Sequence, residues 1–360
     1  MRRQSAGFSL VELMVAITLG LLLTTAVVSV FVGSRQAYQS TAGIGALSDG
    51  GRVALDLISQ SARSAGYLAC NSSLTGKPDT LLPVTSLVND FGTGVTGFEA
   101  AGTGNAPPGA YAMPNTPAAG AAGDWNGPGL DAAVFAAGGG APVKGSDVLV
   151  LRSTVSGTTA SYTTVDIAPG ANSVPVSPVF NLSPTAPQLQ VGDYGAISDC
   201  TKSVIFQTTG TGGTVTFNQP LGADDGFVAG ALVAQLSTSV YYIGVGSDGD
   251  SSLWRLQVQS ASGGVFTAQE LVPDVENMQV LYGIDPAGTQ TASAYITADL
   301  VGATPVVSIQ VAVLAASPPG NGPTQAVPAF QLLGTAVTPP ADTRLRKVFS
   351  ATINLRDAVH

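Results

Sequence analysis

The chain has 360 residues, enough for one large domain or two modest ones. Charged residues make up 10% of it, against about 25% in an average soluble protein, and its net charge is −9. The 45% apolar content excludes a wholly disordered chain, and the acidic balance argues against a nucleic-acid-binding surface. One terminal histidine, His360, and two cysteines do not supply a Ser-His-Asp or Cys-His mechanism or a four-ligand zinc site. We therefore expect no enzyme, with no catalytic residue, cofactor or metal.

The amino terminus combines a short basic head with a long apolar run. Residues 13–32 carry no charge, and a helix of that length spans about 30 Å, the thickness of a bilayer core. Arg2 and Arg3 would stay in the cytoplasm, which places the residues after Val32 outside. A cleaved signal peptide and a simple membrane anchor are the alternatives. Neither explains Glu12 at the start of the run, where an unpaired carboxylate is unfavourable.

The motif GFSLVE (residues 7–12), placed before an apolar helix, resembles the class III signal of type IV prepilins. The resemblance implies that prepilin peptidase cuts between Gly7 and Phe8, removes the leader 1–7 and then N-methylates Phe8. It also implies that Glu12 meets the Phe8 amine of a neighbouring subunit and sets the register of helices in a filament. Pairing of the same two groups within one helix, at i and i+4, is geometrically possible too. A buried carboxylate needs such a partner.

A single pilin-type helix is expected over residues 8–66, with its transmembrane part at about 10–32. Glycines 43, 45, 50 and 51 each weaken a helix by about 1 kcal/mol relative to alanine, which predicts a kink or loosening there. Beyond them the pattern predicts an amphipathic segment that packs on a sheet and stops at Gly66. Its expected stripe is Val53, Leu57, Gln60/Ser61, Ser64 and Leu68, with Leu55, Ile58, Ala62 and Ala65 beside it.

Residues 67–360 are expected to form a β-rich head, which makes the fold class α+β. Within it, residues 85–145 are rich in Gly, Ala and Pro and show little periodicity, so we expect a loose surface insertion. The alternative is a receptor-contacting loop with Trp125 and Tyr111 as exposed anchors. Strands are predicted at 147–152, 160–167, 202–207, 213–218, 237–245, 253–258, 278–284, 306–315 and 345–355, with a hairpin turn at 209–212. Residues 271–279 read as a short helical turn or a strand entry.

Four further segments resemble the PilW group of minor pilins, distant relatives of the J-type pseudopilins of type II secretion. They are GYLAC (66–70), SDC with IFQ (198–200 and 205–207), ELVPDVENMQVLYGID (270–285), and residues 344–356 beginning RLRKVF. The likeness covers both ends and most of the middle and fails across 85–145. Even without a seven-residue leader the chain is far larger than a typical major pilin, which also favours a minor pilin.

The resemblance implies a protein that assembles rather than catalyses. We expect a single-pass inner-membrane protein with its head in the periplasm, which then enters the pilus at the cell surface. Its expected partners are prepilin peptidase/N-methyltransferase, other minor pilins, the major pilin, the inner-membrane assembly platform and, before assembly, membrane lipid, with no nucleic acid. A role in initiating or capping the pilus is the leading hypothesis. A pilus-tip adhesin and a type II secretion pseudopilin are the alternatives.

Three groups of side chains remain. In an oxidising periplasm Cys70 and Cys200 would form a disulfide, which stabilises by roughly 5 kcal/mol at most, and two buried free thiols are the alternative. The aspartates at 224–225 and 248–250 are read as turn residues rather than cation ligands. The basic cluster of Arg344, Arg346 and Lys347 is expected on an exposed strand face, with a subunit-contact patch as the second interpretation.

Overall fold

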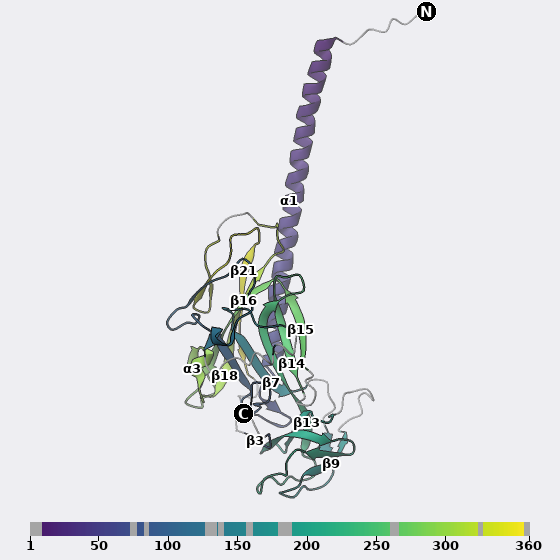
Figure 1. The fold of residues 1–360 in the computed structure, drawn as a ribbon, viewed down its shortest axis with the longest axis vertical. Coiled ribbons are helices and arrows are strands. Elements are labelled where there is room, and N and C mark those ends of the chain that lie inside the picture. Colours follow the sequence, from purple (N-terminus) through teal and green to yellow (C-terminus); the bar gives the residue numbers. More distant parts are fainter. Residues whose placement is uncertain are drawn as a thin grey trace, which may run out of the picture.

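The protein is a long helix joined to a β-rich head, the α+β organisation expected from the sequence (Figure 1). The computed structural model describes residues 9–72, 78–82, 86–126, 135, 140–155, 161–178, 189–259, 266–322 and 327–355. Helix α1 (Leu10–Ala62) is continuous; its first half stands free of the head and its second half lies against it. The cleavage site predicted at Gly7 and Phe8 lies outside the described residues.

The largest sheet has twelve strands and runs through most of the head. Its strands are β3 (Asp79–Thr80), β4 (Val95–Ala100), β6 (Trp125–Asn126), β7 (Val148–Thr154), β8 (Ser161–Thr163), β9 (Ser173–Pro178), β10 (Tyr194–Ser198), β11 (Ser203–Gly210), β12 (Thr214–Phe217), β13 (Leu232–Val245), β14 (Ser251–Val258) and β15 (Phe266–Pro273). The first half of β13 pairs with β8 and β10, and its second half pairs with β7 and β14. This one long strand therefore joins the part of the head beside α1 to the distal part (Figure 1).

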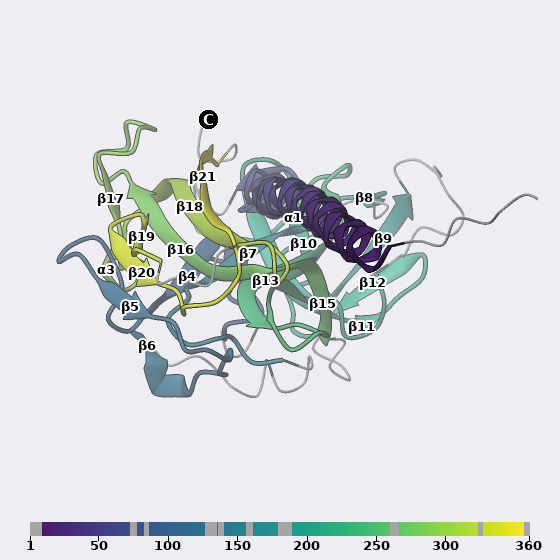
Figure 2. The same ribbon diagram turned by 90° about the horizontal axis from the view of Figure 1, so that it is seen from above.

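Three smaller sheets complete the head. A four-stranded sheet contains β17 (Ala294–Ile296), β16 (Val275–Ile284), β18 (Val306–Ala316) and β21 (Arg346–Asn354); a three-stranded one contains β19 (Phe330–Leu332), β20 (Thr335–Thr338) and β5 (Ala110–Ala112); and β1 (Tyr67–Leu68) pairs with β2 (Asn71–Ser72). Two short helices lie wholly within the described residues, η1 (Ala122–Asp124) and α3 (Ala298–Val301). Seen from above, α1 lies between β21 and β15, so it contacts both the four-stranded sheet and the largest one (Figure 2).

Most of the strands predicted from the sequence are present in the structure. The hairpin around residues 209–212 is formed by β11 and β12, which pair antiparallel. The predicted strand at 160–167 is reduced to β8, and residue 160 lies outside the described residues. The helical turn considered for 271–279 is wrong, because these residues end β15 and begin β16 around Asp274, whose φ is 58°.

Strand β7 is buried on both faces, which explains why residues 148–151 are apolar without alternation. Leu149 and Leu151 point into a core shared with α1 and the four-stranded sheet. Val148 and Val150 point to a second core on the opposite face of the largest sheet. The distal part of the head has a third core, which includes Phe206 and Phe217 with ring centroids 4.4 Å apart.

The expectation of a loose insertion over residues 85–145 is wrong for much of the described part. Strand β4 pairs along β7 within the largest sheet, and Val95 belongs to the core beneath α1. Trp125 is 4% exposed, and its indole Nε1 donates a hydrogen bond to the carbonyl of Ser146 at 2.9 Å. Tyr111 is half-buried. Low periodicity hid this contribution because the strands here are short and separated by turns.

Candidate functional site: an exposed helix seated on a cross-linked head

The first half of α1 presents its apolar side chains to the surroundings on all sides. Every residue from 10 to 39 is exposed; Leu10, for example, is 74% exposed. Among the described residues α1 is the one helix long enough and apolar enough to cross a membrane. Exposed apolar surface on this scale requires an apolar environment, which a bilayer or a bundle of similar helices supplies.

The polar side chains within the apolar run are satisfied by the helix itself. All four hydroxyl groups between residues 13 and 32 donate to backbone carbonyls three or four residues earlier: Thr18 to Val15, Thr24 to Gly20, Thr25 to Leu21 and Ser29 to Ala26, at 2.7–2.9 Å. Such bonds remove the penalty of placing a hydroxyl in an apolar medium. Glu12 is therefore the one polar side chain of this half, between residues 10 and 32, whose need for a partner the helix does not meet.

Glu12 lies in the first turn of α1, close to the residue where the helix begins. Ser9 is the N-cap and its carbonyl accepts the first intrahelical bond from the Leu13 amide at 3.1 Å. A carboxylate here is favoured by the helix dipole, since the free N–H groups at the amino end carry partial positive charge. Glu12 is exposed and has no ion-pair partner among the described residues, so its charge is available to another group.

The second half of α1 is fixed to the head by a stripe of mostly small residues. The buried positions are Gly43, Leu47, Gly51, Ala54, Ile58, Ser59 and Ala62, at helical spacings of three and four. A packing face was therefore predicted correctly, but its centre was not. Val53 is 49% exposed, whereas Ala54 and Ile58 are fully buried. The small Ala54 side chain lets the strands approach the helix, so the larger Val53 faces outward.

The predicted kink at the glycines is also wrong, because α1 is helical throughout them. Two of these glycines are instead points of close approach. A Cβ at Gly51 would overlap the ring of Phe349 in β21, and one at Gly43 would lie 2.7 Å from Cγ of Asn321. Gly45 has open space around it. The informative signal in the sequence was the spacing of Gly43 and Gly51, eight residues apart and hence on one face.

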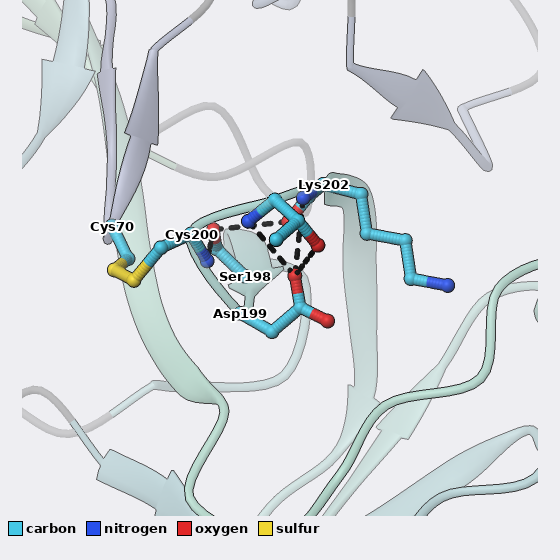
Figure 3. Close-up of a disulfide and its surroundings, with 6 residues drawn as sticks. Cys70, Ser198, Asp199, Cys200 and Lys202 are labelled. Carbon is cyan, nitrogen blue, oxygen red and sulfur yellow. Dashed lines mark hydrogen bonds between the residues drawn. A yellow bond between two sulfur atoms is a disulfide. The ribbon is translucent and has the colours of Figure 1, made fainter.

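A disulfide links the chain that leaves α1 to the distal part of the head. Cys70 lies in the turn between β1 and β2, and Cys200 lies in the turn between β10 and β11; their Cα atoms are 4.6 Å apart (Figure 3). The pair closes a sequence separation of 130 residues. It therefore limits how far the head can rotate away from the end of the helix.

The turn that carries Cys200 is held by side chains around it. Asp199 Oδ1 accepts hydrogen bonds from the backbone amides of Thr201 and Lys202, at 3.0 and 3.1 Å, and Ser198 Oγ donates to the Lys202 carbonyl at 3.1 Å (Figure 3). These bonds offset the left-handed conformation of Cys200, whose φ is 69°. The cysteine is thus presented by a fixed turn.

The basic cluster near the carboxyl end is not an exposed strand face. The side chain of Arg346 is fully buried and pairs with Glu276 (2.6 Å) and with Asp342. Arg344, with a side chain 7% exposed, pairs with Asp274 at 2.7 Å and with Asp250. Lys347 is exposed, with its Nζ 5.1 Å from the centre of the Phe349 ring. Sequence reasoning missed these pairs because three of the four carboxylates lie 70 to 94 residues away along the chain, while Asp342 lies four residues from Arg346.

The aspartates considered as cation ligands do serve as turn residues. Asp248 Oδ1 accepts from the Asp250 amide at 3.0 Å, and Asp225 Oδ2 accepts from the Gly222 amide at 3.0 Å. Carboxylate oxygens of Asp248, Asp250 and Asp274 lie within 4.8 Å of one another. The guanidinium of Arg344 already donates to two of the three, so it supplies positive charge that a cation would otherwise bring.

Two buried carboxyl groups lie between the sheets without a basic partner among the described residues. Asp147, at the start of β7, accepts from the amides of Ala100 and Val280 at 2.9 and 2.8 Å, and so connects β4 to β16. Glu99 is 2% exposed, and Thr103 Oγ1 donates to one of its oxygens at 2.8 Å. Burial raises the pKa of Glu99 to about 7, and burial followed by the Glu99 charge raises the pKa of Asp147 well above its usual range.

Two family models match the chain. One, described as type IV pilus-assembly protein W, covers residues 240–357, which include β14, β16, β18 and β21. The other, described as a prokaryotic N-terminal methylation motif, covers residues 2–28. No curated protein matches the chain. The N-terminal methylation motif implies processing by prepilin peptidase, and the apolar helix that follows it agrees with anchoring in the inner membrane before assembly. With this motif at one end and the assembly domain at the other, the chain has the two sequence features of a PilW-type minor pilin, a structural protein of the type IV pilus.

Proposed function

We propose that this minor pilin takes part in the initiation of type IV pilus assembly and is incorporated at or near the tip of the filament. The observation that carries the proposal is the division of α1. Residues 10–32 offer an exposed apolar surface with no partner in the described chain, while Gly43 to Ala62 are fixed to the head. A subunit of this form can exchange lipid for neighbouring helices without rearranging its head.

Maturation would prepare the helix for that exchange. Cleavage between Gly7 and Phe8 would remove Arg2 and Arg3, the charges that hold the leader in the cytoplasm. It would also create an amine on Phe8, which the same enzyme would methylate. The proposed partners are then prepilin peptidase, other minor pilins, the major pilin and the inner-membrane assembly platform, with lipid around the helix beforehand.

The proposed role of Glu12 follows from its surroundings. A carboxylate at the centre of a bilayer is unfavourable by roughly 2.5–3.5 kcal/mol in insertion experiments. The hydroxyl groups of the run are satisfied within the helix, so Glu12 alone would gain from a cationic neighbour. The Phe8 amine of an adjacent subunit is such a cation, and pairing with it would set the axial register of the two helices.

The amino terminus tests maturation directly. Mass spectrometry of the chain from sheared pili should show a first residue of N-methylated Phe8. An intact Met1, or cleavage beyond residue 20, would contradict the proposal.

Substitution of Glu12 separates maturation from assembly. We expect Glu12→Ala to leave cleavage at Gly7 intact and to reduce incorporation into pili, because the carboxylate no longer offsets the neighbour's amine. Asp49→Ala is the matched control, since it removes one exposed carboxylate from the same helix outside the apolar run. Normal incorporation of Glu12→Ala would show that the carboxylate does not set register.

Two observations count against the tip-adhesin alternative, which the expected insertion over residues 85–145 motivated. Trp125, considered as an exposed anchor, is buried, and strand β4 of the expected insertion pairs with β7 in the largest sheet. The match to a pilus-assembly family likewise favours the pilus over type II secretion. Loss of piliation without loss of exoprotein release, in cells lacking the chain, would distinguish these two systems.

A further inference from the structure

A pocket of about 240 Å³ opens beside the buried side chains of Arg344 and Arg346. Its lining residues have no role in the maturation of the chain or in the packing of α1 on the head as described above. Its apolar lining residues include Tyr111, Met113, Pro114, Pro319 and Pro340. Its charged lining residues are Lys144, Asp250, Glu276, Asp342 and Arg344. Apolar walls over a few convergent polar groups are typical of a binding site.

The charged residues of the pocket belong to a cluster of side chains with excess negative charge. Arg344 and Arg346 together contact four carboxylates, two each, and Asp248 lies close to two of them. This wider group has five carboxylates against two guanidinium groups, a formal charge of −3, but its Arg346, Asp248 and Asp274 lie outside the pocket lining. The lining residues alone carry three carboxylates against Arg344 and Lys144, a formal charge of −1. Lys144 at the rim is balanced by Asp124, 3.3 Å away. The side chains of Asp250 and Asp342 remain 43% and 31% exposed, so their oxygens can accept further donors.

The pocket lies at the end of the head nearest the apolar half of α1. Pro319 in its wall is two residues from Asn321, which packs on Gly43 of the helix. Gly43 is eleven residues beyond Val32, or roughly 17 Å along the helix. The pocket is therefore close to the point where α1 leaves the head, and neighbouring helices packed on the apolar half of α1 would bring their own heads near it.

We propose that this pocket receives a lysine or arginine side chain from a neighbouring pilin of a different kind, an inference that rests on the proposed function. The methylene stem would lie along Tyr111 and the prolines, and the cation would reach Asp250 and Asp342. A second copy of this chain is a poor donor, because it is itself strongly acidic, with 14 basic and 23 acidic residues.

Photo-crosslinking in piliated cells tests the proposal on the full chain. With Met113→p-benzoylphenylalanine, we expect an adduct whose mapped peptide belongs to another pilin and contains lysine or arginine. Adding Asp250→Asn and Asp342→Asn should lower the adduct yield about tenfold, because two charge-assisted contacts are lost. Asp166→Asn with Asp224→Asn, two exposed carboxylates at the distal part of the head, removes the same charge and should leave the yield unchanged.

Folding of the variants is checked by thermal unfolding in detergent. Each arginine keeps one carboxylate in the double variant, Asp274 for Arg344 and Glu276 for Arg346, so the fold should persist. An unchanged yield, an adduct with a second copy or a protein other than a pilin, or a mapped peptide without a basic residue would overturn the inference. The N-methylated Phe8 peptide in the same sheared pili reports separately on the proposed function.

Discussion

The close contact between α1 and β21 predicts that two glycines of the same helix respond to alanine with opposite signs. Gly51 faces Phe349 so closely that a Cβ would overlap its ring, while Gly45 has no atom within 4 Å of the position a Cβ would take. Both residues lie within the helix, so alanine should gain up to about 1 kcal/mol at either site from helix propensity. The tertiary contact alone distinguishes them.

The expected change in the free energy of unfolding combines the gain in helix propensity with the cost of overpacking. At Gly51 the overlap must be relieved by moving Phe349 or the helix, and overpacking of this kind destabilises by about 1–3 kcal/mol. We therefore expect Gly51→Ala to lower the free energy of unfolding by up to about 2 kcal/mol after the propensity gain. Gly45→Ala should raise it by up to about 1 kcal/mol.

Guanidinium unfolding of the full chain in mild detergent, followed by near-ultraviolet circular dichroism, measures both values. Phe349→Ala should make Gly51→Ala neutral or stabilising in the double variant, because the ring that the new Cβ meets is gone. If Gly51→Ala stabilised the protein as much as Gly45→Ala, the glycine would be a simple weak point of the helix, as the sequence suggested, and the packing interpretation would be refuted.

Three further predictions concern the head. Arg346→Ala should destabilise the head by about 3–5 kcal/mol, because Glu276 would be left buried without its cation. The double variant Arg346→Met with Glu276→Met should be destabilised much less, and denaturant unfolding curves of the two variants measure the difference. The raised pKa values of Glu99 and Asp147 mean that the folded state holds these protons more tightly than the unfolded chain. The contribution of these two groups to stability should therefore be fully present below about pH 4 and be lost as pH rises through about 7. Glu99→Gln should flatten this part of the profile between about pH 5 and 8, and an unchanged slope would contradict the assignment. Replacing Cys70 and Cys200 by serine should lower the free energy of unfolding by up to about 5 kcal/mol, which reduction of the native chain should reproduce.

The long helix, the motif in front of it and the main strands can be predicted from the sequence, because each depends on residues that are close together along the chain. The uncharged run at 13–32 determines a membrane-length helix, and the motif at 7–12 in front of it indicates a prepilin. Runs of β-branched and apolar residues mark β7, β13, β16 and β18, since each is buried on at least one face. The two cysteines and a predicted oxidising location were enough to expect their pairing.

Other features depend on which residues meet in space, and only the tertiary structure decides them. Glycines 43 and 51 signal weakness in an isolated helix, but the nearby Phe349 and Asn321 make them contact points. Arg344 and Arg346 are buried because their carboxylates arrive from the β13–β14 turn and from β16. Trp125 packs into the core on one face of the largest sheet, where the carbonyl of Ser146 accepts a hydrogen bond from its indole N–H. Propensity and periodicity describe neighbours along the chain, whereas charge burial and close packing are fixed by neighbours brought together across sheets.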